Sequence, residues 1–383
     1  MKHLKLFLTV FFLGGIALMG FAQVPVSTDP DSTCAGSQGE PYMVNPVAGS
    51  TFYWFVTGTG HTLHSNNTHE VTVDWSNIPG TDTLKVLQID QYSCPADTIK
   101  LTVVRVAPPN AYAGADATIC GTETYTISDA TATSYKHLQW TTSGDGSFSD
   151  ATALNPVYTP GPGDITAGTV TLTLTANPIV PCAQPASDAF VLTIVPIPVV
   201  SAGGPATICS NGAYNITAAT ASNYASLLWT TSGDGTFNDA TSLNPVYTPG
   251  PNDISAGSVT LTLTATPISP CSDPVSDAAV LTIIPAPVAN AGPDATLCWG
   301  EVYYLDNVTV QNAVSITWTT SGTGTFDNPN IQNPIYTPSV QDCQNGGVTL
   351  TLTVTGAEPC SEAQSSRQLI YRPKPVTGPI LHY

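Results

Sequence analysis

The sequence has few charged side chains and very few bases. Charged residues make up 9% of the 383 residues, with 9 Lys and Arg against 27 Asp and Glu, so the formal net charge is −18. Proteins that follow a phosphate backbone need clustered Lys and Arg. The shortage of bases therefore excludes nucleic acid as a partner and argues against adhesion to anionic lipid.

The sequence also lacks the short motifs of common catalytic sites. It contains no Gly-x-Ser-x-Gly, no His-Glu-x-x-His, no P-loop, and no Gly-x-Gly-x-x-Gly after a predicted strand. We therefore predict that the protein is not an enzyme and that it needs no cofactor.

Long apolar runs are absent, and the one continuous run is too short to span a bilayer comfortably. It covers residues 6–18, follows the basic residues 1–5, and precedes Gly20-Phe21-Ala22. Small residues at positions −3 and −1 suit a signal peptidase. These features predict a signal peptide over 1–22, no membrane insertion after its cleavage, and a secreted or cell-surface protein.

One group of motifs occurs three times at a fixed spacing. Trp-Thr-Thr-Ser-Gly-(Asp/Thr)-Gly begins at Trp140, Trp229 and Trp318, and successive copies are 89 residues apart. Each copy is followed by Asn-Pro-(Val/Ile)-Tyr-Thr-Pro and then by Val-Thr-Leu-Thr-Leu-Thr. Such alternation is the period of a strand with one buried face, and repeats of this length indicate tandem units.

The predicted strands are separated by Gly, Pro, Asn and Asp, and no segment has a helical period. We therefore predict an all-β fold, a tandem array of four immunoglobulin-like antiparallel β-sandwiches. The predicted modules cover 23–106, 107–197, 198–286 and 287–375, and 376–383 is a tail or the start of a further module. Proline-rich joints between modules predict a semi-rigid array.

The cysteines follow the same repeat. In the last three modules a leading cysteine lies 20 residues before the Trp, and a second cysteine follows the first by 62 residues. Cys34 precedes Trp54 by the same 20 residues, and Cys94 follows Cys34 by 60, which identifies a diverged fourth copy. Zinc is disfavoured because no Cys-x-x-Cys is present. We predict one disulfide within each module: Cys34–Cys94, Cys120–Cys182, Cys209–Cys271 and Cys298–Cys360.

Cys343 stands outside this pattern. It occupies the position that Ile165 and Ile254 hold in the sister modules. We interpret it as a free, semi-buried thiol that replaces an apolar side chain. Pairing with another molecule is the alternative.

The tryptophans divide into two groups. Four are predicted to fill the module cores, with sugar stacking as the alternative: Trp54, Trp140, Trp229 and Trp318. Trp75 and Trp299 lie outside this set, so they are the candidates for contact with a glycan or protein ligand.

No residue set has the spacing of a strong metal site. His61, His64 and His69 lie in one segment, but they would form one site only if that segment turns. Asp-Gly in the repeated hairpin is first a turn signal. Calcium at the module joints, near Asp116 and Asp294, is the alternative that stays open.

Several segments resemble a known domain family. Tyr53-Trp-Phe-Val56, Val71-Thr-Val-Asp-Trp75 and Gly80-Thr-Asp-Thr-Leu84 resemble the PKD-like domain of secreted Bacteroidota proteins. Ala-Gly-Pro-Asp followed by the Trp and Gly-Asp-Gly hairpin resembles the immunoglobulin-like repeats of large gliding- or adhesion-associated surface proteins. The resemblance covers essentially the whole mature chain. The usual Trp-Asp-Phe-Gly-Asp-Gly is replaced here by Trp-Thr-Thr-Ser-Gly-Asp-Gly, so details of that hairpin do not transfer.

Export, repetition and the lack of catalytic motifs point to one class of function. We expect a non-catalytic extracellular structural or adhesive repeat protein, acting as a semi-rigid stalk or surface-interaction array. Its expected partners are a glycan or protein ligand and other copies along the array. The alternative is a carbohydrate-binding or accessory module array from a larger secreted enzyme.

Overall fold

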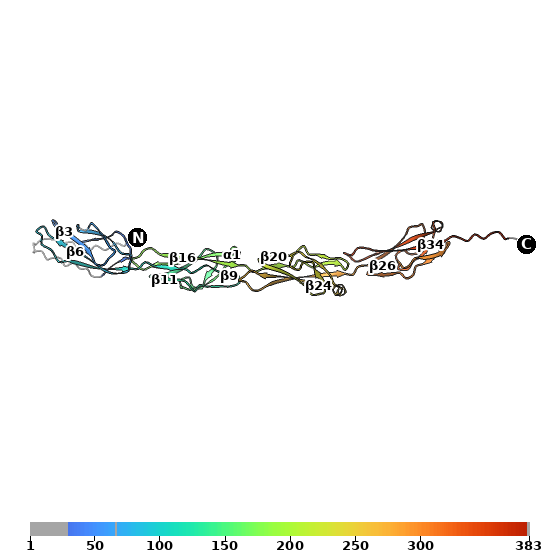
Figure 1. Cartoon of the computed structure of the whole chain (residues 1–383), viewed down its shortest axis with the longest axis horizontal. Helices are drawn as coiled ribbons and strands as arrows, with labels where there is room; N and C mark the ends of the chain where they lie inside the picture. Colours follow the sequence, from blue (N-terminus) through green and yellow to red (C-terminus); the bar gives the residue numbers. More distant parts are fainter. Residues whose placement is uncertain (1–29, 66, 381–383) are drawn as a thin grey trace, which may run out of the picture. The chain divides into compact units, whose positions relative to one another are not determined.

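The computed structural model describes residues 30–65 and 67–380, so the predicted signal peptide lies outside the described residues. Nearly all regular structure is β-strand, and the helices are short (Figure 1). Among the described residues, no helix is long and apolar enough to cross a membrane. The prediction of a tandem all-β fold is confirmed.

The chain divides into two compact units. The first contains the described residues up to Asp116, with Tyr125–Thr159 and Thr171–Val191; the second contains Ala117–Thr124, Pro160–Val170 and the described residues from Leu192 onward. The boundary falls inside the second predicted module, although every sheet stays within one predicted module. The four-module division remains a prediction from the repeats, and modules one to four are named below in that sense.

Module one contains two sheets, with strand orders β1-β7-β6-β3 and β2-β5-β4. Its strands are β1 (Asp31–Cys34), β2 (Glu40–Met43), β3 (Thr51–Val56), β4 (Thr62–His64), β5 (Glu70–Asp74), β6 (Gly80–Ile89) and β7 (Ile99–Val106). Trp54, Val73 and Trp75 are buried in the core that these strands form.

Module two contains a four-stranded sheet, β12-β15-β16-β9, a three-stranded sheet, β10-β14-β13, and the pair β11-β8. Its elements are β8 (Asn110–Tyr112), β9 (Ala117–Cys120), β10 (Tyr125–Thr126), β11 (Thr131–Thr133), β12 (Tyr135–Thr142), β13 (Ser147–Phe148), β14 (Val157–Thr159), α1 (Pro162–Ala167), β15 (Thr169–Pro178) and β16 (Ala186–Val195).

Module three repeats this plan with the sheets β18-β25-β24-β21 and β19-β23-β22 and the pair β17-β20. Its elements are β17 (Val199–Ser201), β18 (Ala206–Cys209), β19 (Tyr214–Asn215), β20 (Thr220–Ser222), β21 (Tyr224–Thr231), β22 (Thr236–Phe237), β23 (Val246–Thr248), α2 (Pro251–Ala256), β24 (Ser258–Pro267) and β25 (Val275–Ile284).

Module four has the same arrangement, with the sheets β27-β34-β33-β30 and β28-β32-β31 and the pair β26-β29. Its elements are β26 (Val288–Asn290), β27 (Ala295–Cys298), β28 (Tyr303–Tyr304), β29 (Thr309–Gln311), β30 (Ser315–Thr320), β31 (Thr325–Phe326), β32 (Ile335–Thr337), α3 (Val340–Gln344), β33 (Gly347–Thr355) and β34 (Ala363–Arg372).

Each module carries one parallel strand pair beside its antiparallel strands. In every module the short strand that ends at the leading cysteine pairs in parallel with the last strand: β1 with β7, β9 with β16, β18 with β25 and β27 with β34. A chain that enters a sandwich at one end and leaves at the other runs in the same direction in its first and last strands. Such strands can pair side by side only in parallel.

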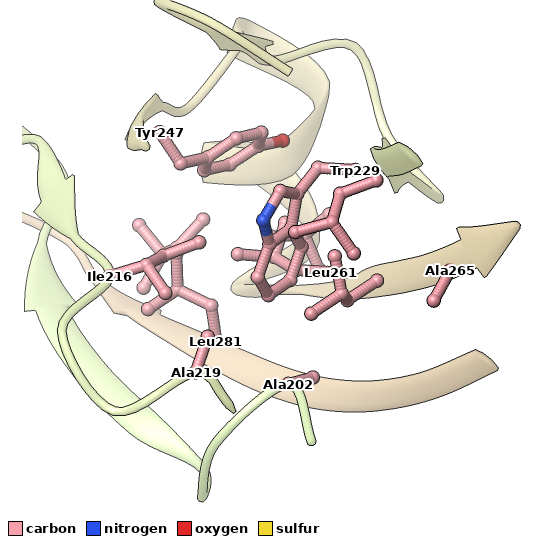
Figure 2. Packing of buried hydrophobic residues seen from close by; sticks show 12 residues of the cluster. Ala202, Ile216, Ala219, Trp229, Tyr247, Leu261, Ala265 and Leu281 are labelled. Atoms are coloured by element: carbon pink, nitrogen blue, oxygen red, sulfur yellow. The ribbon is translucent and has the colours of Figure 1, made fainter. Parts of the chain in front are cut away.

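The core of module three lies between its sheets. Along β24, buried Val259, Leu261 and Leu263 alternate with partly exposed threonines, as the repeated Thr-Leu pattern predicts. Trp229 lies in the same buried cluster as Leu261 and Tyr247, which Figure 2 shows. Trp54, Trp140 and Trp318 are buried in the same way, with no more than 6% of each residue exposed.

Three short helices, α1 to α3, are absent from the sequence prediction. In α2, Pro251 occupies the first turn, and the helix ends at Gly257, whose φ of 74° lies in the left-handed region. Proline at the start and glycine just after the end are helix signals. Six residues are nevertheless too few to show a helical period, so the pattern does not reveal them.

Each of these helices carries a buried aspartate in its first turn: Asp164, Asp253 and Asp342. The Asp253 carboxylate accepts a hydrogen bond of 2.6 Å from the Tyr247 hydroxyl. It also accepts bonds of 3.0 to 3.2 Å from the backbone amides of Asp234, Gly235 and Gly250. One carboxylate therefore ties together the hairpin after β21, the strand β23 and the start of α2.

Hydrogen bonds keep the Asp253 and Asp342 carboxylates ionised. Burial by itself would raise the pKa of Asp253, but the bonds from Tyr247 and from the amides outweigh it and hold the pKa below its ordinary value. The pKa of Asp342 is lowered against burial in the same way. Burial raises the pKa of Tyr247 to about 12, so its hydroxyl keeps its proton and donates. Because the folded pKa is depressed, this stabilisation is present above about pH 4 and is lost as the pH falls through the folded value.

The network explains why the hairpin contains glycines. A Cβ on Gly233 would overlap the Asp253 carboxylate, and a Cβ on Gly235 would overlap the Tyr247 hydroxyl. The Gly-Asp-Gly motif is therefore a packing requirement of the buried aspartate, in addition to being a turn.

Two further positions change together between modules three and four. In module three, Asp234 accepts from the Asn252 amide at 3.1 Å and so caps α2 from the hairpin, while a Cβ on Gly250 would overlap Asp234. In module four, Thr323 and Ser339 occupy these positions, and the Ser339 hydroxyl caps α3 itself by accepting from the Asp342 amide at 3.1 Å. The helix cap comes from the hairpin in one module and from the helix in the other.

This exchange predicts coupled mutational effects. Gly250→Ser alone should destabilise module three by about 2 kcal/mol through overlap with Asp234, and Asp234→Thr alone by about 1 kcal/mol through loss of the cap. In the double variant the introduced serine can cap α2 beside the smaller threonine side chain, so the loss should be smaller than the sum by about 1 kcal/mol or more. Calorimetric unfolding of the full chain measures this coupling.

Gly204→Ser is the matched control in the same module, because a Cβ there meets nothing within 4 Å. It should leave the unfolding transition unchanged. Strictly additive losses at positions 234 and 250 would contradict the proposed exchange of caps.

Candidate functional site

Three disulfides join successive modules of the described chain, and we take these junctions as the candidate functional site. The bonds are Cys34–Cys182, Cys120–Cys271 and Cys209–Cys360, with sequence separations of 148, 151 and 151 residues. Each joins the leading cysteine of one module to the second cysteine of the next. The predicted pairing within each module is therefore wrong, although six of the eight predicted cysteines do form disulfides.

Module three shows why a bond within one module cannot form. Cys209 ends β18 and lies opposite Ile284, the last residue of β25. Cys271 lies in the loop before Val275, where β25 begins. The 10 residues of β25 separate the two cysteines by about 30 Å at about 3.3 Å per residue. A disulfide requires Cα atoms within about 7 Å, and Cys209 meets that condition with Cys360, at 4.9 Å.

The second cysteine of each bond arrives at the same place on the preceding module. Its sulfur lies against the carbonyl oxygen of the residue that ends the last strand there: Cys182 against Val106 at 3.6 Å, Cys271 against Val195 at 3.4 Å, and Cys360 against Ile284 at 3.5 Å. That residue is the strand partner of the leading cysteine. Every bonded junction thus has two covalent connections, the peptide joint and the disulfide beside it.

Three described cysteines are unpaired. Cys94 and Cys298 are exposed, which corrects the prediction that both form disulfides within their modules. Cys343 is a free thiol, 4% exposed, in the core of module four. Its burial leaves the sulfur no path to another molecule, which speaks against the alternative of intermolecular pairing.

The histidines of module one do not converge on one point. His61 Nε2 lies 3.3 Å from Asp82, His64 Nε2 lies 2.7 Å from Asp74, and His69 lies 3.5 Å from Glu70. Burial lowers the pKa of His61, which leaves the ring neutral at pH 7. Among the residues that the structure describes, no group of three or more His, Cys, Asp or Glu side chains is placed to hold a metal ion.

The two aspartates near the joints accept backbone hydrogen bonds instead of lying together. Asp116 accepts from the Val191 amide at 2.8 Å, and Asp294 accepts from the Gln368 amide at 2.8 Å. Each thus holds the segment before the leading cysteine's strand against the last strand of the same module. Calcium binding at these joints remains a proposal, because no described group of three or more His, Cys, Asp or Glu side chains is placed there to hold the ion.

The two candidate ligand-binding tryptophans differ in exposure. Trp75 is 2% exposed, its indole nitrogen donates to the Tyr42 hydroxyl at 3.2 Å, and its ring lies edge-on to His61. It therefore offers no open face to a ligand, and its assignment as a ligand contact is corrected. Trp299 is partly exposed and packs against the core of module four, so its role as a contact remains a proposal.

The buried aspartates and the pairing between modules are the features that sequence reasoning missed. Asp164, Asp253 and Asp342 recur at the 89-residue spacing, so the repeat contained a signal for them. The sequence contains no signal that each disulfide joins one module to the next. The spacing between cysteines is as regular within a module as it is between modules, so it does not distinguish the two pairings.

No family model and no curated protein sequence matches the chain. Among solved structures, the extracellular cadherin domains 3–6 of protocadherin gamma B2 match with 13% identity over 91% of this chain and 99% of that chain, at a TM-score of 0.32. Immunoglobulin domains 1–4 of Sidekick-1 match with 12% identity over 90% and 96%, at 0.29. Drosophila N-cadherin domains EC1–4 match with 15% identity over 90% and 99%, at 0.31. These scores are too low for any property of those proteins to be transferred to this chain.

The assignment of the thiols predicts a labelling pattern. In the folded monomer, a maleimide should modify Cys94 and Cys298 rapidly, and it should reach Cys343 only after denaturation, because that thiol is buried. Peptide mass spectrometry after labelling counts the sites. Labelling of Cys343 alone, and only after denaturation, would instead support disulfides within the modules.

Proposed function

We propose that the protein is a non-catalytic extracellular structural or adhesive repeat protein that acts as a semi-rigid stalk. The observation that carries this proposal is the disulfide between successive modules. A tandem array joined by peptide joints alone can bend and extend at every joint. A second covalent connection at each joint restrains that motion, which is what a protein that holds a surface or a ligand at a distance requires.

The disulfides also support export. Disulfides form and persist in oxidising compartments and are rare in the cytosol, so three of them suit a secreted chain. The predicted signal peptide points to the same compartment. We therefore propose that the protein acts in the extracellular space or on the cell surface.

The buried carboxylates support a structural role over a catalytic one. Asp253 and Asp342 already accept four or more hydrogen bonds each from their own modules. A general acid or base needs an accessible proton and a pKa near the operating pH, whereas the pKa values of these groups are lowered. We propose a glycan or a protein as the ligand of the array and leave its identity to binding experiments.

The staggered bonds determine how far the chain can be stretched. Under tension between the two ends, the shortest covalent path passes through Cys34–Cys182, along residues 182–209, and through Cys209–Cys360. The two bonds remove segments of 148 and 151 residues from the extensible path. The remaining path stays short even when every module unfolds.

Single-molecule force spectroscopy tests this proposal. The oxidised chain, pulled from its ends, should have a contour length shorter than the reduced chain by about 300 residues, or about 1,000 Å at about 3.4 Å per residue. Equal contour lengths for the oxidised and the reduced chain would contradict a stalk whose modules are joined by disulfides. Addition of a calcium chelator should leave the oxidised contour length unchanged.

Two double variants sharpen the experiment. Cys120→Ser with Cys271→Ser should leave the oxidised contour length unchanged, because the shortest covalent path does not use that bond. Cys34→Ser with Cys182→Ser should lengthen the path by about 120 residues, or about 400 Å, since the path must then run through Cys120–Cys271. An equal effect of the two variants would contradict the staggered connection.

A further inference from the structure

Among the described residues, Cys298 of module four occupies the position of a junction cysteine but has no cysteine partner. Cys298 ends β27 and lies opposite Arg372, as Cys120 lies opposite Val195 and Cys209 opposite Ile284. In the bonded junctions, the incoming sulfur sits against the carbonyl of that opposing residue. Cys298 is instead exposed and unpaired.

The backbone around Cys298 already has the bonded geometry. The amide of Glu301 donates to the Cys298 carbonyl at 3.1 Å, as the amide of Glu123 does to Cys120 at 2.9 Å. The Cys298 amide donates to the Glu301 carboxylate at 3.0 Å, as the Cys120 amide does to Glu123 at 3.2 Å. The site therefore has the local structure of a junction cysteine before any bond forms.

Module one has the complementary half. Cys94 lies in the loop between β6 and β7, which corresponds to the loops that carry Cys182, Cys271 and Cys360 in the other modules. Those three cysteines bond to the preceding module, whereas Cys94 is exposed and unpaired. An Asp90 carboxylate oxygen holds the Cys94 amide at 2.8 Å, which fixes the position of the loop.

We propose that Cys298 of one copy forms a disulfide with Cys94 of a second copy, so that copies join head to tail by the same bond that joins modules within the chain. The proposal rests on the proposed stalk function and extends it to assembly. The two surfaces are different patches of the chain, so the contact is heterologous and can continue from copy to copy.

The bond forms by oxidation of two thiols. Cys298 and Cys94 each lose a proton, the two sulfurs join, and two electrons pass to the disulfide of a thiol–disulfide oxidoreductase or of oxidised glutathione, which is released as two thiols. The three bonds within the chain require an oxidant of the same class. An oxidant of this class is present wherever exported proteins form their disulfides.

The test uses the full mature chain, incubated with a glutathione redox buffer and separated without reductant. We expect a ladder of covalent multimers that collapses to monomer on reduction, and a cross-linked peptide that joins Cys94 to Cys298 in the mass spectrum. Cys94→Ser and Cys298→Ser should each remove the ladder. An equimolar mixture of the two variants should give a dimer and nothing larger, because it contains only one competent pair per two chains.

Cys343→Ala is the control and should retain the ladder, and circular dichroism should show that all variants keep their β structure. Three results would overturn the proposal: monomers whose two thiols remain reactive after oxidation, a Cys94–Cys298 bond within one chain at monomer mass, or dimers joined by two Cys298 residues. If the force experiment succeeds and no Cys94–Cys298 peptide forms, the stalk function stands and the link between copies fails.

Discussion

The parallel pairing of the first and last strands is the constraint on which the rest of the structure depends. It places each leading cysteine at the end of the module where the chain leaves, beside the last residue of the last strand. From there the cysteine can reach only the next module, and the loop that carries the second cysteine meets it at that end. A disulfide therefore joins module one to module two, module two to module three, and module three to module four. The proposed stalk follows from these bonds more than from the shape of any one sandwich.

The modules do not depend on the disulfides for their cores. In modules three and four, Trp229 or Trp318 fills the space between the sheets, and Asp253 or Asp342 fixes the hairpin, the tyrosine strand and the short helix around one buried charge. A single bond that closes a loop of about 150 residues would stabilise the folded chain by about 5 kcal/mol in the chain-entropy model. Because the bonds join modules, that stabilisation acts on their association. The buried tryptophan and aspartate therefore stabilise each module, whereas the disulfides stabilise the association of successive modules.

Much of the fold could be predicted from the sequence, because its signals are local. The Thr-Leu alternation of β24 and the spacing of Trp140, Trp229 and Trp318 predict strands and repeats. The aspartate network could not be predicted in the same way, since Asp253 and the Gly233–Gly235 hairpin are far apart in sequence and meet only in three dimensions. The disulfide pairing was predicted wrongly for a related reason. Spacing identifies which cysteines are equivalent, but only the parallel direction of β18 beside β25 reveals which cysteines are neighbours.

Disulfide mapping is the decisive test of the bonds between successive modules. The oxidised chain is digested without reductant at a pH low enough to prevent exchange, and the cross-linked peptides are identified by mass spectrometry. We expect peptides that join Cys34 to Cys182, Cys120 to Cys271 and Cys209 to Cys360. Peptides that join Cys120 to Cys182 and Cys209 to Cys271 would contradict this pairing, because each module would then be closed on itself and the junctions would have no second connection.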